Sequence, residues 1–86
     1  MKDLERTLKA LANKKRLAIL KYLKKSGRAS VADIADAIDL SFKATSKHLG
    51  ILFAADILEK EKISLQIFYY LSPVQKPAAK QVIDIL

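Results

Sequence analysis

Cysteine is absent from the 86-residue sequence, and glycine and proline are scarce, with two residues of each. Without cysteine the chain can form no disulfide, no thiolate nucleophile and no thiolate metal site, and it suits a reducing compartment such as the cytoplasm. A chain that is 51% hydrophobic and has so few helix-breaking residues is too apolar for a disordered tail. We therefore expect residues 1–86 to fold as one domain, with a modest core that dimerisation would enlarge.

Long hydrophobic runs are also missing. The longest apolar stretch, residues 49–55, is far shorter than the ~18 residues that a membrane span needs. Charges are interleaved with apolar residues at the amino terminus, unlike the pattern of a signal peptide. We expect neither a signal peptide nor a transmembrane helix, and no membrane partner.

Groups that catalyse reactions are few. The sequence has a single histidine, His48, no glycine-rich phosphate loop, and acidic residues placed as helix caps or isolated surface charges. None of these forms a converging set of acid, base and nucleophile. We predict that the protein is not an enzyme and that it carries no cofactor.

Acidic residues are outnumbered: nine Asp and Glu stand against 16 Lys and Arg, which gives a net charge of +7. The placement is uneven as well. Residues 13–28 contain seven basic residues and no acid, and residues 41–55 contain two lysines and no acid. Such segments favour a polyanionic partner, either nucleic acid or an anionic membrane surface.

Leucine spacing predicts two helices at the start of the chain. Leucines recur every three or four residues within residues 3–12 and again within residues 14–26, so each segment has one apolar stripe. Asn13 is placed to cap the second helix, and Gly27, which tolerates a positive φ, is placed to end it.

A second pair of helices follows, joined by a very short turn. Ser30 opens a capping box and begins a third helix. Only Asp39 and Leu40 separate that helix from Ser41, which is placed to cap a fourth helix running to about residue 55. A turn this tight has the length found in helix-turn-helix units.

The hydrophobic period changes after the fourth helix. Residues 57–62 and 65–71 are rich in Ile, Phe and Tyr, which is typical of two antiparallel strands of a hairpin. A final amphipathic helix is marked by Ala79, Val82, Ile83 and Leu86. The predicted fold is mainly α with a β-hairpin (α+β): a winged helix-turn-helix with about five helices and a two-stranded wing.

Four stretches within residues 8–71 carry a more specific pattern: LKALANKKRLAIL, VADIADAIDLS, ATSKHLGIL and YYL. The first contains R-L-x-I-L and the third contains A-x-S-x-H-L-x-x-L. Together they resemble the arsenic-repressor (ArsR) family of winged-helix regulators, in which the third stretch lies in the recognition helix. The resemblance implies a DNA-binding transcriptional regulator, and more specifically a repressor.

The metal sites of that family are not reproduced. Where many members carry C-x-C, residues 30–32 read SVA, and the last helix offers Asp84 but no histidine. We therefore predict no zinc or arsenical site, and the sequence specifies no small-molecule effector.

Asp39 and Asp56 stand at turns where the family often has glycine, and aspartate is among the few other residues that adopt left-handed conformations. The wing tip, residues 62–65, lacks the family's usual glycine and arginine.

The fourth helix has two opposite faces at 100° per residue. The face predicted to point inward consists of Thr45, His48, Leu49 and Leu52. The opposite face is basic and small, and consists of Lys43, Lys47, Gly50 and Ala54, with Ser46 at its edge. A face of this kind can enter the major groove, where lysine reaches phosphate or guanine and serine bonds to either.

The residues predicted to contact DNA lie on three elements: the start of the second helix, the fourth helix, and the wing. They are Lys14, Lys15, Ser41, Phe42, Lys43, Ser46, Lys47, Gly50, Lys60 and Lys62. At the start of the second helix, cations oppose the helix dipole, which favours a role in phosphate binding for Lys14 and Lys15.

Four other side chains carry separate expectations. His48 is expected to be packed and to use a ring nitrogen in a structural hydrogen bond. For Arg16 the resemblance implies a structural ion pair or helix cap. Phe42 either packs under the third helix or touches a thymine methyl group. Phe53 is expected to make a core or subunit contact.

The terminal helices are predicted to form a two-fold dimer interface, because their apolar stripes exceed what one small core can cover. The predicted interface residues are Leu4, Leu8, Ala79, Val82, Ile83 and Leu86. The sequence thus predicts a homodimeric, sequence-specific regulator that binds double-stranded DNA. The alternative is a winged-helix module that makes protein contacts in a transcription or RNA-processing assembly, for which duplex binding would be weak and sequence-blind.

Overall fold

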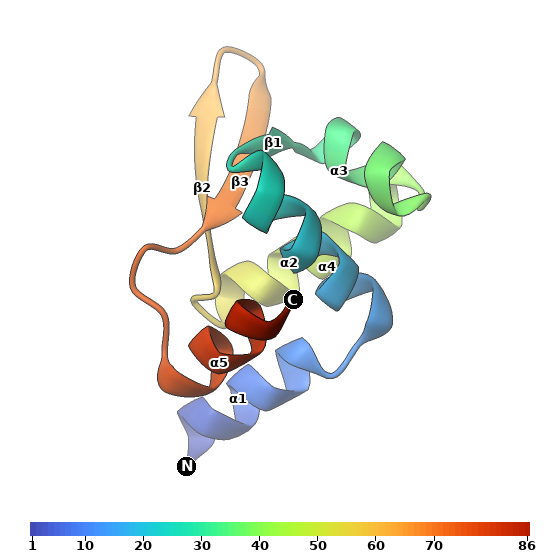
Figure 1. Ribbon diagram of the computed structural model, residues 1–86. Coiled ribbons are helices and arrows are strands. Elements are labelled where there is room, and N and C mark those ends of the chain that lie inside the picture. Colours follow the sequence, from blue (N-terminus) through green and yellow to red (C-terminus); the bar gives the residue numbers. More distant parts are fainter.

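Side-chain caps begin three of the five helices in the computed structural model, which describes residues 1–86 (Figure 1). Asn13 accepts the backbone amides of Lys15 and Arg16, at 2.9 and 3.0 Å. Ser30 and Ser41 each accept one amide of the first turn of their helix. These caps confirm the predicted helix starts. The elements are α1 (Lys2–Leu11), α2 (Lys14–Ser26), β1 (Ala29–Ser30), α3 (Val31–Ile38), α4 (Phe42–Ala54), β2 (Leu58–Ile63), β3 (Gln66–Leu71) and α5 (Pro77–Ile85).

Left-handed residues end several of these elements. Gly27 follows α2 with a φ of 81°, as predicted, and Asp39 and Asp56 take φ values of 55° and 63°. Both aspartates therefore adopt the conformation expected of them at positions where glycine is more usual. Ser64, at 58°, opens the two-residue turn at the tip of the wing.

The sheet contains one strand more than the sequence predicts. β2 and β3 form the expected antiparallel hairpin, in register from Leu58 opposite Leu71 to Ile63 opposite Gln66. The additional strand, β1, pairs with the other edge of β3, so the order is β1-β3-β2. β1 has only two residues, too few for an alternating pattern to be visible in the sequence. With five helices and this sheet, the fold is the predicted winged helix-turn-helix.

α2 is the central helix of the core. Its Ile19, Leu20 and Leu23 are fully buried, and they share one apolar cluster with Leu49 and Leu52 of α4. Burial of aliphatic side chains of this size stabilises a fold by roughly 1.5–3 kcal/mol each. None of the helices combines the length and the apolar character needed to cross a membrane.

α1 and α5 pack against each other within the chain (Figure 1). Ala79 and Ile83 of α5 are 1% and 8% exposed and belong to the chain's own core. Their assignment to a dimer interface is therefore wrong: the stripe on α5 is used to cover the other helices of the same chain. Val82 and Leu86 are partly buried against the same core.

Three cations of α2 bind the carboxyl ends of three other helices. Lys15 Nζ donates to the carbonyl of Ile38, the last residue of α3, at 3.1 Å. Arg16 donates to the carbonyls of Ala10 and Lys9 in α1, at 2.6 and 3.1 Å. Lys24 Nζ donates to two carbonyls near the end of α5. Because these carbonyls lie at the negative end of their helix, each contact with a cation fixes the position of that helix against α2.

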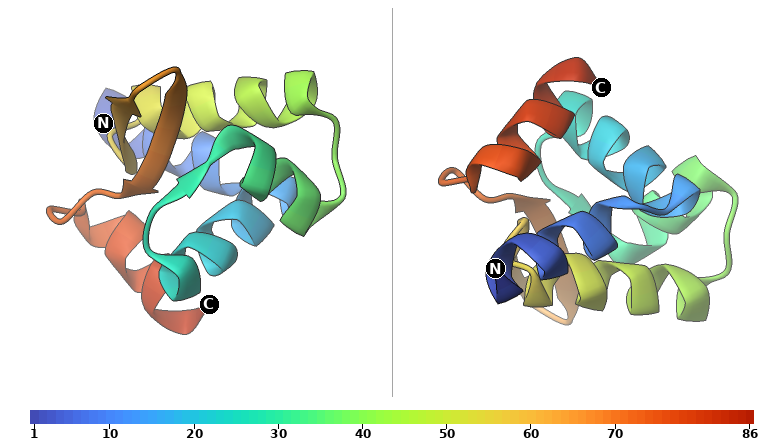
Figure 2. Two further views of the ribbon diagram at one scale, coloured as in Figure 1. Left: turned by 90° about the horizontal axis from the view of Figure 1, so that it is seen from above. Right: turned by 90° about the horizontal axis from the view of Figure 1, so that it is seen from below.

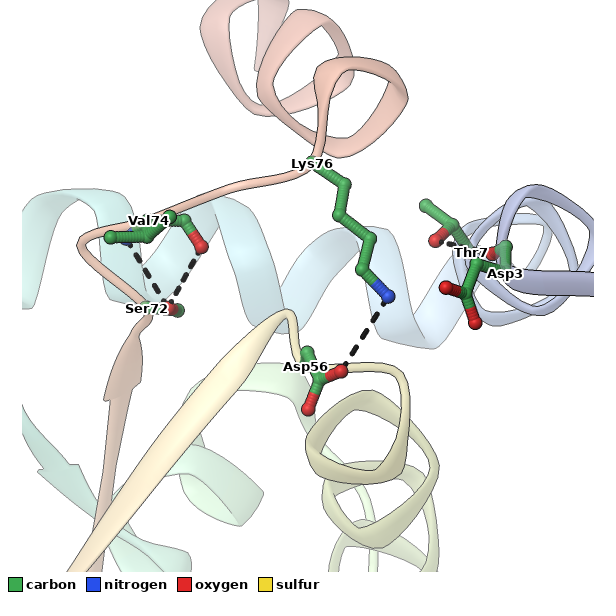
Figure 3. Close-up of polar contacts among 6 residues, drawn as sticks. All are labelled: Asp3, Thr7, Asp56, Ser72, Val74 and Lys76. Atoms are coloured by element: carbon green, nitrogen blue, oxygen red, sulfur yellow. Dashed lines mark hydrogen bonds and ion pairs between the residues drawn. The ribbon is translucent and has the colours of Figure 1, made fainter.

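The segment between β3 and α5 is held by its own polar contacts (Figure 3). Ser72 Oγ bonds to both the carbonyl and the amide of Val74. Lys76, just before α5, reaches Asp56 at 3.5 Å, beside Asp3 and Thr7 of α1. The corner after α4 and the start of α5 are thereby joined.

Replacing Arg16 with Met is expected to lower the free energy of unfolding by about 2–3 kcal/mol, because hydrogen bonds from a charged group to partly buried acceptors are removed. Urea denaturation followed by circular dichroism measures the change. Lys21→Met is the matched control, since Lys21 is exposed on the same helix and makes no hydrogen bond, and it should change stability by less than ~0.5 kcal/mol. Equal losses of stability in the two variants would show that the Arg16 hydrogen bonds do not stabilise the fold.

Candidate nucleic-acid interface

The turn between α3 and α4 sets the direction of the fourth helix. The Asp39 amide bonds back to the carbonyl of Asp36 at 3.3 Å, and the Leu40 amide to that of Ala35 at 3.0 Å. This pattern, with Asp39 left-handed, is the Schellman arrangement that ends a helix abruptly. Ser41 then caps α4, its Oγ 3.1 Å from the Ala44 amide. The chain therefore turns directly from one helix into the next, and α4 lies along one edge of the molecule (Figure 2).

The inward face of α4 is buried as the sequence predicts. Thr45, Leu49 and Leu52 are each 0% exposed. The outward face consists of the exposed residues Lys43, Lys47, Gly50 and Ala54, with Ser46 half-buried at its edge. The predicted division of the helix into two faces is confirmed.

The outward face of α4 is positive and makes no ion pair. Neither Lys43 nor Lys47 contacts a carboxylate, since the three salt bridges of the structure all lie elsewhere. α4 itself contains no acidic residue. Both ammonium groups are therefore free to bind an external anion.

Gly50 lies in the middle of that face. A Cβ at this position would meet no atom of the protein within 4 Å, and its φ is an ordinary helical one, since Gly27 alone among the glycines has a positive φ. Glycine inside a helix costs about 1 kcal/mol relative to alanine. The fold itself gives no reason for glycine here, whereas close approach of an external molecule to the helix would give one.

Phe42 begins α4 and remains 61% exposed. It lines a shallow pocket of about 160 Å³ with Val31 and Ala32 of α3 and Leu65 at the wing tip. Of the two expectations for Phe42, packing against the third helix is met only in part. Most of the ring remains exposed to an external molecule.

The two wing lysines differ in their surroundings. Lys60 lies over the ring of Phe53, its Nζ 4.4 Å from the ring centroid, which is a cation–π distance. Phe53 is thus covered in part by the chain's own wing, and 36% of it stays exposed. Lys62, nearer the tip, is exposed and makes no such interaction with an aromatic ring.

The lysines at the start of α2 differ in the same way. Lys15 is bound to the Ile38 carbonyl, so the structure gives it a role within the fold, and a part in phosphate binding loses support. Lys14 is exposed and forms no hydrogen bond or ion pair. Of this pair, Lys14 alone is free to bind a phosphate.

His48 joins the inward face of α4 to Arg16. Arg16 Nη1 lies 3.1 Å from His48 Nδ1, and because a guanidinium can only donate, Nδ1 must be the acceptor and the ring proton lies on Nε2. Burial lowers the pKa of His48 below its usual value, and the charges of Arg16, Lys47 and Lys15 lower it further. The structural hydrogen bond expected of His48 is confirmed. Arg16, expected to form an ion pair or a helix cap, caps the carboxyl end of α1 and forms no ion pair.

A known protein family, known sequences and solved structures are similar to this chain. A helix-turn-helix domain family matches residues 11–61. The arsenical resistance operon repressor of Bacillus subtilis (strain 168) is 32% identical over 72 residues, which cover 84% of this chain and 69% of the repressor. HlyU from Vibrio cholerae N16961 superposes with a TM-score of 0.82 at 31% identity, covering 98% of this chain and 87% of HlyU.

A further solved structure is the homodimeric winged helix-turn-helix DNA-binding domain Mb0332 from Mycobacterium bovis. It superposes with a TM-score of 0.84 at 26% identity, covering 98% of this chain and 75% of that domain.

Stability should depend on pH through His48. Because its pKa in the folded protein lies below 6.5, its contribution is complete above about pH 6.5 and is lost as the pH falls towards the folded value. The free energy of unfolding, measured by urea denaturation between about pH 7.5 and pH 5, should therefore decrease. His48→Asn keeps an acceptor near the Nδ1 position but does not titrate, so its decrease should be smaller. The same pH slope in both proteins would contradict this role of His48.

Proposed function

Because the chain belongs to the ArsR-like family of winged helix-turn-helix transcriptional regulators, we propose that it binds double-stranded DNA sequence-specifically, as a homodimer, and represses transcription. The observation that carries this proposal is the outward face of α4: basic, free of acid, and without any partner inside the protein. A helix placed after a tight turn and exposed in this way is the element that winged helix-turn-helix proteins insert into the major groove.

In the proposed complex α4 is the recognition helix. Lys43, Ser46 and Lys47 face the groove and contact phosphates or base edges, and Gly50 lets the helix backbone approach closely. Phe42, exposed near the amino end of α4, is placed to touch a thymine methyl group. Ser41, Lys14 and Lys62 lie at the periphery and fit contacts to the backbone of the duplex.

A second copy of the chain is expected to cover α1. Leu4 and Leu8 are 45% and 50% exposed on successive turns of this helix, which is a large apolar surface for an exposed face. Ile85 at the end of α5 is also exposed, and Val82 and Leu86 are only partly buried. A two-fold dimer through these residues would bring its recognition helices to successive major grooves about 34 Å apart. Such a dimer bound over a promoter would block transcription, in agreement with a relative that is a repressor.

Lys43→Ala and Lys47→Ala are expected to weaken DNA binding without unfolding the protein. A lysine that binds only phosphate should lower the slope of log affinity against log salt by about one for each phosphate it no longer neutralises, equally for all sequences. A lysine that reads guanine should instead cost ~1–3 kcal/mol of discrimination at one base pair. Duplexes selected from a random pool and titrated over a salt series measure both. Unchanged affinity and slope in both variants would exclude α4 from the interface and favour the protein-contact alternative.

Two further variants of α4 separate stability from DNA binding. Leu49→Ala should lower the free energy of unfolding by ~2–5 kcal/mol through a buried cavity. Gly50→Ala should raise it by about 0.5–1 kcal/mol, yet weaken DNA binding because the added methyl group lies on the groove-facing side. A Gly50→Ala protein that binds DNA as tightly as the wild type would show that the helix does not approach the duplex closely.

The dimer is tested by Leu4→Lys/Leu8→Lys. Light scattering at micromolar concentration should give about twice the 9.6 kDa chain mass for the wild type and the monomer mass for the variant, because a charge cannot be buried without a partner. The control is Val74→Lys, which changes an exposed apolar residue in the segment before α5 and should leave the mass unchanged. A monomeric wild type would contradict the proposed dimer.

A further inference from the structure

A second basic surface lies on α1. Lys2, Arg6 and Lys9 are spaced by four and three residues, so they share one face of the helix. All three are exposed, and none forms a salt bridge. This face is not the one that carries Leu4 and Leu8, and the interface on α4 does not include it.

The face borders a groove between α1 and α4. The groove has a volume of about 560 Å³ and is lined by Lys2, Glu5, Arg6 and Lys9, by Arg16 of α2 and by Ile51 of α4. Glu5 is the single acid among them. The Arg16 guanidinium is held by the carbonyls of α1 and by His48, so it adds charge to the groove but cannot move out of it.

The groove lies directly beside the DNA-facing side of α4. Ile51 follows Gly50, one residue around the helix, on the same flank as His48. Phe53 and the wing lie on the opposite flank, where Lys60 covers the Phe53 ring. Figure 2 shows α1 alongside α4. A single extended ligand could therefore contact the outward face of α4 and the groove at the same time.

The basic row suits a polyanion better than a small anion. Three cations spread over eight residues, Lys2 to Lys9, span about 10 Å along the helix axis. No buried donor converges on one point of the groove, as the binding of a single small anion would require. A helix inserted into the major groove, which is about 12 Å wide, has a sugar–phosphate backbone on each side of it.

We propose that the groove between α1 and α4 binds the sugar–phosphate backbone that borders the major groove on the side away from the wing. The proposal rests on α4 being the recognition helix. α1 then has two functions on two faces: the leucines contact a second copy of the chain, and Lys2, Arg6 and Lys9 hold one strand of the duplex without reading its sequence.

The test compares Arg6→Gln/Lys9→Gln with Lys21→Gln/Lys25→Gln. Both double variants remove two exposed positive charges, but Lys21 and Lys25 lie on the side of α2 opposite its buried residues and do not line the groove. The duplex selected by the wild type and an unrelated duplex of the same length are titrated over a salt series. The α1 variant should lower the salt slope by about two per protomer and weaken both duplexes by the same factor. The α2 variant should leave the slope close to that of the wild type.

Phosphate ethylation locates the contact. In the wild type, ethylation of phosphates on one border of the groove occupied by α4 should interfere with binding, and this interference should disappear in the α1 variant. Thermal unfolding verifies that each variant is folded, and Lys2→Gln/Lys9→Gln replaces the first variant if it is not.

The outcomes separate this inference from the proposed function. Equal salt slopes for the α1 and α2 variants, with binding still weakened by Lys47→Ala, would overturn the α1 contact and leave the role of α4 intact. A wild type without salt-dependent duplex binding would overturn both. Inorganic phosphate tests the remaining possibility. If it raises the melting temperature of the wild type but not of the α1 variant, and if the α1 and α2 variants have the same salt slope for DNA binding, the groove is a small-anion site and the proposal is wrong.

Discussion

The arrangement of the whole chain depends on the contacts between the cations of α2 and the carboxyl ends of its neighbours. Lys15, Arg16 and Lys24 bind the ends of α3, α1 and α5, while the opposite side of α2 forms the centre of the core. Each such contact contributes only a modest free energy. Hydrogen bonds are directional, however, whereas the hydrophobic effect is not, so these contacts fix how the packed helices are oriented. α4 is fixed at its start and at its middle by this system. Lys15 holds α3, from which α4 follows after a tight turn, and Arg16 reaches α4 itself through His48.

These contacts change the meaning of the net charge. The basic run in residues 13–28 suggests a surface for polyanions, yet four of its seven cations bind groups of the protein itself: the three helix-binding residues and Arg28, which pairs with Glu61 at 2.7 Å and lies over Tyr70. The cations without internal partners are distributed differently, along α4, on α1 beside the groove, on the outer side of α2 and at the tip of the wing. The number of basic residues indicates the kind of partner, whereas their internal contacts decide which of them can meet it.

The sequence predicts local features well, but it predicts poorly which segment a given strand or helix face will contact. Helix caps such as Asn13 and Ser41, the inward face of α4 and the left-handed aspartates follow from short-range rules, and all are found. β1 is not predictable, because two residues give no period. The interface assignment of Ala79 and Ile83 is wrong because an amphipathic stripe shows that a face will be buried, but not whether the same chain or a second one will cover it. The basic face of α1 is hard to see in the sequence because acidic residues at positions 3 and 5 interrupt it, and Glu5 lies beside the three cations in the groove.

The outward face of α4 also has a consequence for how this protein can diversify. Lys43, Lys47 and Gly50 are exposed, and neither lysine forms a hydrogen bond or an ion pair within the chain, so substitutions there cost the fold little. Arg16 and His48, by contrast, cannot change without disturbing two or three helices at once. The outward face of α4 can therefore change by single substitutions that each leave a folded protein, whereas a change in the contacts that orient α4 also lowers the stability of the fold.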